Sequence, residues 1–162
     1  MTIQVFRLAL LLLLALGLPA HAATFRGMVT HVTDGDTLWV RPTAGADTVE
    51  IRLVDIDAPE GCQPFGPEAK RALAALVLHE PVVVRTRGVD DYQRTLAQVQ
   101  HRGRDVNGWL VREGHAWSTG FQRRPGRYER LEDEARQERR GLWSAPGALE
   151  PRSFRRKHGR CQ

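Results

Sequence analysis

Residues 49–60, VEIRLVDIDAPE, join an apolar run to an acidic end, and the other predicted elements lie on both sides of this stretch. Alternating valine, isoleucine and leucine predict a strand over residues 49–56, and the acids with the proline predict a loop directly after it. Arg52 lies inside the apolar part, and buried arginines are rare unless they are paired. Arg52 therefore either forms an internal salt bridge to an acid of the same stretch or neutralises charge on a phosphoryl group.

Alternating apolar residues elsewhere in the chain predict four more strands, and apolar residues at helical spacing predict three helices. The other strands are expected at residues 24–32, 37–41, 82–85 and 95–100. The helices are expected at residues 67–78, 106–113 and 128–140. Strands with one inserted helix, followed by helices, indicate an α+β protein. Five short strands of this kind can close into an OB-type β-barrel, a scaffold commonly used on oligonucleotides.

Two acidic clusters lie where predicted strands end. One is the turn DGDT at residues 34–37, and the other is the loop that begins at Asp55. Asp-Gly pairs are common in turns because both residues tolerate the backbone angles, so a purely structural role for Asp34 is one interpretation. Carboxylates from two strand ends, with no histidine or cysteine nearby, also suit Ca²⁺, which takes about six to eight oxygen ligands. Because the EF-hand spacing is absent, a calcium site has to be assembled from separate segments.

The first 22 residues have the pattern of an export signal, with Arg7, an apolar run over residues 8–18, and small residues at Ala20 and Ala22. A membrane anchor is the alternative, but the apolar run is too short to cross a bilayer of ~30 Å. We therefore expect a secreted or periplasmic protein, a monomer without a membrane association, whose mature chain begins near Ala23. That chain is long enough for one domain with one core.

The net charge of +5 is carried mostly by arginine, since only Lys70 and Lys157 are lysines. An arginine-rich domain suits a polyanionic partner, although genomic base composition explains the same bias equally well. Cys62 and Cys161 both remain after signal removal, and in an oxidising compartment they allow one pairing, a Cys62–Cys161 disulfide. No metal-ligand spacing surrounds either cysteine, which argues against a zinc site.

Six segments, in order, resemble the staphylococcal-nuclease (thermonuclease) family. The first two are DGDT at residues 34–37 and the stretch from Arg52 to Glu60, and DYQR at residues 91–94 is similar to the third. The remaining three are FGPEA at residues 65–69, VNGWLVREG at residues 106–114 and GLWS at residues 141–144. Each segment alone is weak, but together they span most of the mature domain. The resemblance implies a five-stranded OB-type barrel that hydrolyses DNA, with RNA as an alternative substrate, in a Ca²⁺-dependent reaction.

The resemblance also implies a role for each matching position. The carboxylates of Asp36 and Asp57 and the backbone carbonyl of Ala58 would hold Ca²⁺, with Asp34 as an outer acid. Glu60 would activate or orient the attacking water, and Arg52 and Arg94 would contact the scissile phosphate. Tyr92 would pack beside the nucleotide. The physical sense is that the metal and two arginines supply positive charge where the transition state gains negative charge.

The chain departs from the family pattern near the site. Asp55 adds an acid where many relatives have glycine or an apolar residue, the loop over residues 61–64 is short, and tyrosines are missing around Gly120 and Phe121. We expect a nuclease domain over residues 23–150 and a loosely ordered basic tail over residues 151–162 that raises affinity for nucleic acid. Two other functions stay open: an idle nucleic-acid-binding module, and an envelope interaction protein with structural calcium.

Overall fold

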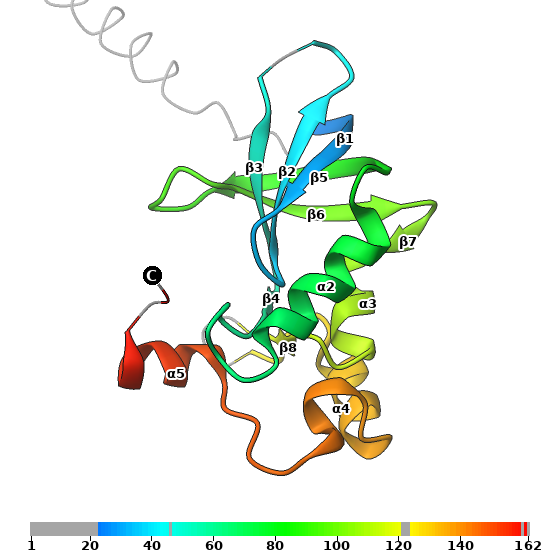
Figure 1. Cartoon of the computed structure of the whole chain (residues 1–162). Coiled ribbons are helices and arrows are strands. Elements are labelled where there is room, and N and C mark those ends of the chain that lie inside the picture. The colour runs from blue at the N-terminus through cyan, green and yellow to red at the C-terminus, as the bar shows by residue number, and fades with distance from the viewer. Residues whose placement is uncertain (1–22, 46, 121–123, 160, 162) are drawn as a thin grey trace, which may run out of the picture.

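The computed structural model describes residues 23–45, 47–120, 124–159 and 161 (Figure 1). The export signal expected at residues 1–22 lies outside the described residues, as does Phe121. None of the helices in the described ranges is long and apolar enough to cross a bilayer.

Five strands close into a barrel. In spatial order they are β3 (Val49–Leu53), β2 (Thr37–Pro42), β1 (Thr24–Val32), β5 (Pro81–Val89) and β6 (Thr95–His101). Neighbours in this order are antiparallel, and the parallel pairing of β3 with β6 joins the two ends of the sheet. A short strand, β7 (Arg104–Asp105), extends the sheet beyond β6. The predicted α+β fold with a five-stranded OB-type barrel is confirmed.

Alternate residues of these strands fill the barrel. Val40 on β2, Ile51 and Leu53 on β3, Val84 on β5 and Val99 on β6 are fully buried. Burying one such side chain contributes roughly 1.5–3 kcal/mol relative to leaving it exposed, so this alternation supplies much of the driving force for closure.

The predicted strand over residues 49–56 is divided in two by a tight turn. Strand β3 ends at Leu53, and β4 (Ile56–Asp57) leaves the barrel to pair with β8 (Trp117–Ser118). Asp55 has a φ of 64° at this turn. Aspartate tolerates the left-handed region better than most residues, so the extra acid noted in the sequence is explained by the turn. The division matters because it directs Asp57 and the following loop towards the end of the barrel.

The helices lie at one end of the barrel and along one of its sides (Figure 1). They are α2 (Gly66–Val77), α3 (Val106–Arg112), α4 (Glu129–Gln137) and α5 (Pro151–His158), with a 3₁₀ turn, η1 (Gly141–Ser144). Helices α2 and α3 pack on the barrel through buried Leu73, Val77, Leu110 and Val111.

Helix α5 corrects two sequence expectations, because there are four α-helices rather than three over the described residues and the tail is not loosely ordered. Pro151 stands in its first turn and Phe154 is buried. A segment of eight residues with one large apolar side chain is too short to show a repeat of apolar residues. Contacts with the rest of the protein, rather than local preference, therefore determine its structure.

Candidate active site

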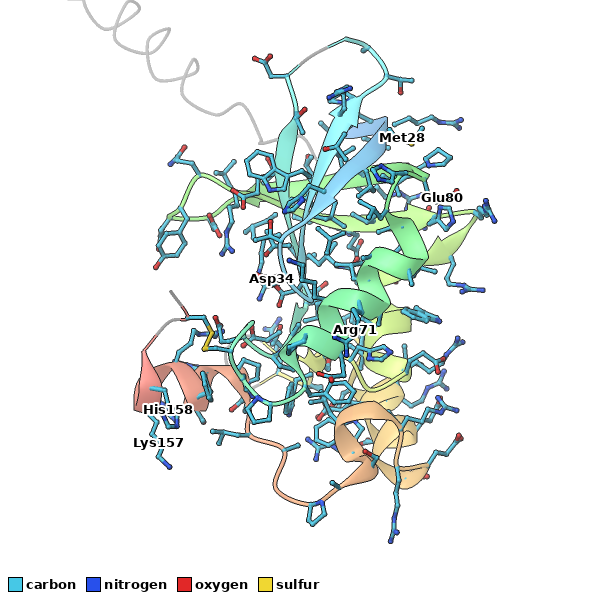
Figure 2. The ribbon with its side chains drawn as sticks, viewed as in Figure 1. Met28, Asp34, Arg71, Glu80, Lys157 and His158 are labelled. Carbon is cyan, nitrogen blue, oxygen red and sulfur yellow. A yellow bond between two sulfur atoms is a disulfide. The ribbon has the colours of Figure 1, made fainter. Side chains whose placement is uncertain are left out.

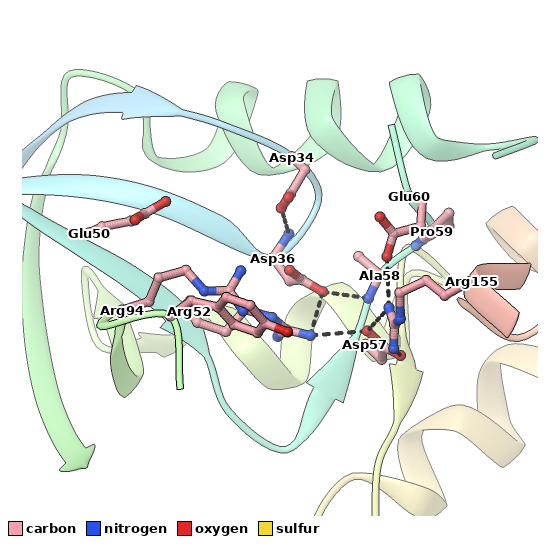
Figure 3. A pocket seen from close by; sticks show the side chains of 11 residues that line it. Asp34, Asp36, Glu50, Arg52, Asp57, Ala58, Pro59, Glu60, Arg94 and Arg155 are labelled. Atoms are coloured by element: carbon pink, nitrogen blue, oxygen red, sulfur yellow. Dashed lines mark hydrogen bonds and ion pairs between the residues drawn. The ribbon is translucent and has the colours of Figure 1, made fainter. Parts of the chain in front are cut away.

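A cleft of about 470 Å³ at the end of the barrel gathers acidic and basic side chains from five separate segments. The turn between β1 and β2 supplies Asp34 and Asp36, and strand β3 supplies Glu50 and Arg52. The segment through β4 supplies residues 57–60, the turn before β6 supplies Tyr92 and Arg94, and α5 supplies Arg155. All of the predicted site residues outside the disulfide therefore line one cleft (Figure 3).

The turn at residues 34–37 depends on Asp34 and on Gly35. Asp34 Oδ1 accepts a hydrogen bond from the Asp36 backbone N–H at 3.0 Å, so Asp34 has the structural role that is common in Asp-Gly turns. A Cβ atom on Gly35 would lie 2.7 Å from Ala58 Cβ and 2.8 Å from Ala69 Cβ. Only glycine therefore lets the turn lie this close to the loop after β4 and to helix α2.

Arg52 joins the two acids that the family resemblance assigns to the metal, Asp36 and Asp57. Its Nη2 lies 3.0 Å from Asp36 Oδ2 and 3.0 Å from Asp57 Oδ1. Its Nη1 donates to the backbone carbonyls of Leu53 at 2.6 Å and Ile56 at 3.1 Å. The internal salt bridge expected for Arg52 is thus present, and its partner is Asp57. The carbonyl bonds hold the guanidinium in a fixed orientation beside the cleft.

Asp36 is the most deeply buried acid of this cluster. Burial raises its pKa to about 7, although Arg52 and the Ala58 backbone N–H act in the opposite direction. That N–H donates to Asp36 Oδ2 at 2.6 Å, which couples the β1–β2 turn directly to the loop carrying Glu60. A carboxylate with this environment gains from an additional cation nearby.

The Glu60 loop is fixed by its own turn and by Gly66. The Glu60 backbone N–H donates to Gln63 Oε1 at 3.2 Å, and the Gln63 N–H donates to the Glu60 carbonyl at 2.8 Å. A Cβ on Gly66 would lie 2.0 Å from the Glu60 carbonyl oxygen, so this glycine allows helix α2 to begin directly beneath the loop. The Glu60 carboxylate faces the cleft (Figure 3).

Arg94 reaches the cleft from the opposite wall. Its Nη2 lies 2.7 Å from Asp90 Oδ2, and its Nε donates to the same oxygen at 2.8 Å. The Arg94 guanidinium also stands over the Tyr92 ring, 5.5 Å from the centroid. Tyr92 is 58% exposed, which agrees with a side chain at the rim of the cleft.

Arg155 was not among the predicted site residues. Its Nη1 donates to Glu60 Oε1 at 2.7 Å, and its Nη2 donates to Asp57 Oδ2 at 2.9 Å. These hydrogen bonds raise the pKa of Arg155 even though burial acts against the charged form. The available sequence signal was indirect: Arg155 stands six positions before Cys161, whose expected partner follows Glu60 by two. Glu50, which also lines the cleft, gave no signal beyond its place on a strand.

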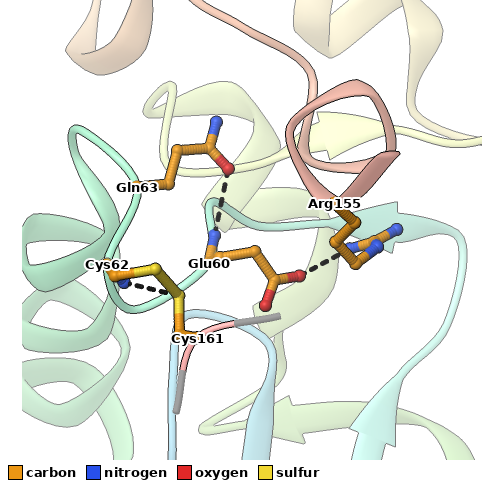
Figure 4. The surroundings of a disulfide bond; sticks show 5 residues. All are labelled: Glu60, Cys62, Gln63, Arg155 and Cys161. Atoms are coloured by element: carbon orange, nitrogen blue, oxygen red, sulfur yellow. Dashed lines mark hydrogen bonds and ion pairs between the residues drawn. A yellow bond between two sulfur atoms is a disulfide. The ribbon is translucent and has the colours of Figure 1, made fainter. Parts of the chain in front are cut away.

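The predicted disulfide is present. Cys62 and Cys161 are bonded, with their Cα atoms 5.6 Å apart, beside the turn that carries Glu60 (Figure 4). The Cys62 backbone N–H also donates to Cys161 Sγ at 2.9 Å. The bond therefore connects the end of the chain to the loop that lines the cleft.

Over the described part of the chain, no group of three or more histidine, cysteine, aspartate or glutamate side chains is arranged to hold a metal ion. The cleft instead offers two carboxylates, Asp36 and Asp57, which approach the same nitrogen of Arg52. Adding a backbone carbonyl gives a small donor set made only of oxygen. Such a set fits a hard cation that keeps most of its coordination for water and substrate, and it does not fit zinc.

Residues 50–145 match the family described as staphylococcal nuclease homologue. The Protein ParB of Escherichia coli is 42% identical over 160 residues, covering 92% of this chain and 89% of that protein. A micrococcal nuclease of Shigella flexneri is 40% identical over 154 residues, covering 88% of this chain and 87% of that protein. A Haemophilus influenzae protein described as an uncharacterized endonuclease is 36% identical over 129 residues, covering 80% of this chain and 72% of that protein.

Proposed function

Since this chain belongs to the staphylococcal nuclease family and is a nuclease, we propose that it hydrolyses the phosphodiester bonds of DNA, and of RNA, with calcium at the barrel-end cleft. The observation that carries the proposal is the convergence of Asp36, Arg52, Asp57, Glu60 and Arg94 on one cleft from separate segments. A mere binding surface has no need of two carboxylates on one guanidinium nitrogen with a third acid beside them.

We assign the metal to the carboxylates of Asp36 and Asp57 and to the carbonyl of Ala58. Calcium held there would supply positive charge for the phosphoryl oxygens and favour ionisation of a nearby water. The raised pKa of Asp36 supports this assignment, because a buried carboxylate of this kind is stabilised in its charged form by a cation.

The arginines would bind the scissile phosphate from two walls of the cleft. Arg52 is anchored by its Nη1 bonds to the Leu53 and Ile56 carbonyls, which leaves Nη2 to be shared between the acids and a phosphate oxygen. Arg94 would approach the phosphate from the β6 side, once its contact with Asp90 is shared with the substrate. Positioned donors of this kind favour the transition state, where negative charge on the phosphoryl oxygens is greatest.

Glu60 would orient the attacking water and accept its proton. The loop from Ala58 to Gln63 is fixed by hydrogen bonds at both ends, so the carboxylate is held over the side of the cleft that contains Asp57. Attack from this side would expel the 5′-oxygen towards Arg94. The products would then carry a 3′-phosphate and a 5′-hydroxyl group.

We also propose that the protein is exported and acts as a monomer outside the membrane, with Tyr92 beside the bound nucleotide. The residues before Ala23 have the pattern of an export signal, and the Cys62–Cys161 disulfide fits an oxidising compartment. We propose that the mature nuclease domain begins after residue 22, and α5, although it lies beyond the expected boundary at residue 150, supplies Arg155 to the same cleft.

The proposal is tested with purified residues 23–162 and plasmid DNA in Ca²⁺, in Mg²⁺ or in excess chelator. We expect cleavage in Ca²⁺ and poor cleavage in Mg²⁺, because Mg²⁺ demands stricter octahedral geometry and releases water reluctantly. Glu60→Gln, prepared in parallel, controls for contaminating nucleases. Robust cleavage in chelator would refute the calcium assignment. DNA binding without cleavage would identify an idle binding module, and calcium-raised stability without cleavage would identify a structural calcium site.

A further inference from the structure

Helix α5 carries one arginine into the cleft and leaves its other basic residues outside. Arg155 is 32% exposed and binds Asp57 and Glu60, whereas Arg152, Arg156 and Lys157 are exposed. Lys157 points away from the rest of the protein (Figure 2). Because of the orientation of α5, Arg155 is the basic residue of this helix that contacts the cleft. It lies against Glu60, the proposed base, and Asp57, a proposed metal ligand.

The position of α5 is determined by contacts beyond those of Arg155. Pro151 and Phe154 are buried, and Gln63 donates from Nε2 to the Leu149 carbonyl just before the helix. The disulfide fixes the other end of the helix through Cys161. Arg155 therefore belongs to a helix that is packed on the protein and covalently linked to it. Its position is fixed by these contacts and not only by its own ion pairs.

The same short loop holds both the tail and Glu60. Gln63 accepts a hydrogen bond from the Glu60 backbone and donates one to the segment before α5, while Cys62 carries the disulfide (Figure 4). A change in the position of α5 is therefore transmitted to Glu60 by two routes, through the loop and through the Arg155 side chain.

We propose that Arg155 is a positioning residue for hydrolysis, which orients the Glu60 and Asp57 carboxylates, and that the Cys62–Cys161 disulfide promotes the reaction through it. This inference rests on the proposed function of the cleft. The two bonds from Nη1 and Nη2 attach one planar guanidinium to both carboxylates, and a planar fork of donors fixes direction as well as distance.

The positive charge of Arg155 should weaken calcium binding, although its hydrogen bonds favour turnover. A cation 2.9 Å from Asp57 Oδ2 competes with a second cation for the same carboxylate, so Arg155 weakens calcium binding while it holds Glu60 in place. Removing Arg155 should therefore tighten calcium binding and slow turnover. A residue with only a structural role would not produce these two opposite changes together.

The test compares Arg155→Met, which keeps most of the apolar stem, with Arg155→Lys and with Arg130→Met. Arg130 is 89% exposed on α4 and controls for the loss of one arginine. In disulfide-bonded protein of full mature length, calcium affinity is measured by calorimetry without nucleic acid. The turnover rate and KM are then measured at saturating calcium, and circular dichroism confirms the fold.

For Arg155→Met we expect turnover to fall by roughly 10–100-fold, as is typical for groups that orient a catalytic residue, with a smaller change in KM. Calcium affinity should rise several-fold, to about 3–10 times that of the parent, because a like charge has been removed. Arg155→Lys should recover part of the turnover, and Arg130→Met should change neither quantity. Unchanged or faster turnover in Arg155→Met would overturn the proposal.

A double-mutant cycle tests the part played by the disulfide. Cys62→Ser/Cys161→Ser should slow turnover more when Arg155 is present than in the Arg155→Met background, where only the route through the loop remains. Independent, additive losses would show that the disulfide does not act through Arg155. If the parent protein fails to cleave DNA in calcium, the proposed function fails, whereas a cleaving parent with an indifferent Arg155 refutes this inference alone.

Discussion

Arg52 and Arg155 both bind Asp57, but the protein supports these two arginines in different ways. Arg52 is on β3, where it lies opposite Thr37 of β2 and Leu96 of β6, so strand pairing fixes it on both sides. Arg155 is on a helix of eight residues whose far end is held by one disulfide. The barrel side of the cleft is therefore fixed by the fold itself. The tail side depends on a covalent bond that can be removed without cutting the barrel.

The largest effects should come from the barrel side. Arg52→Ala, Arg94→Ala and Glu60→Gln should each lower the turnover rate by ~10²–10³-fold or more, because each removes a group that the proposed mechanism places at the transition state. Steady-state cleavage at saturating calcium measures the loss, and circular dichroism should show native structure. If all three folded variants cleave normally, these residue roles are wrong.

This barrel half is also the part of the site that the sequence could predict. The strand pattern places the acids of residues 34–37 and 55–60 at strand ends and Arg52 within an apolar strand, and the resemblance to the nuclease family selected Asp36 and Asp57 among those acids. The division of the predicted strand at Asp55 was missed, because a left-handed backbone at a non-glycine residue leaves no pattern in the sequence.

The tail half resisted prediction for a physical reason. Arg155 is one of several basic residues in a short segment, and its selection depends on how α5 docks. That docking depends on Phe154, on the contact from Gln63 and on the disulfide, all of which are long-range. The pairing of the two cysteines was predictable, but the side of the helix that faces the cleft was not.

Removing the disulfide should lower the free energy of unfolding and leave the barrel folded. It links residues 99 positions apart, and a closed loop of ~100 residues stabilises by at most about 4.7 kcal/mol in the chain-entropy model, with ~2–4 kcal/mol more typical. Chemical denaturation of Cys62→Ser/Cys161→Ser should show this loss while the barrel still folds cooperatively. Mass spectrometry of unreduced periplasmic protein should find no free thiols. Two free thiols there would contradict the Cys62–Cys161 disulfide.

The smallest effect is expected on the outer side of α5. Replacing Arg152, Arg156 and Lys157 by alanine should weaken binding to duplex DNA. The slope of log affinity against log salt concentration should become less steep by up to ~0.9 for each phosphate that is no longer neutralised. Turnover at saturating DNA should stay nearly constant, because these side chains do not line the cleft. Binding titrations over a range of salt concentrations measure the slope, and an unchanged slope would mean that this surface does not touch nucleic acid.

The chemistry of the cleft is tested most directly by identifying the ends of the cleaved strand. A short DNA oligonucleotide is digested by residues 23–162 in calcium, and the product ends are analysed by mass spectrometry, with Glu60→Gln as the control for contaminating nuclease. With Glu60 on one side of the phosphate and Arg94 on the other, the products should carry 3′-phosphate and 5′-hydroxyl groups. Products with 5′-phosphate and 3′-hydroxyl groups would contradict the assignment.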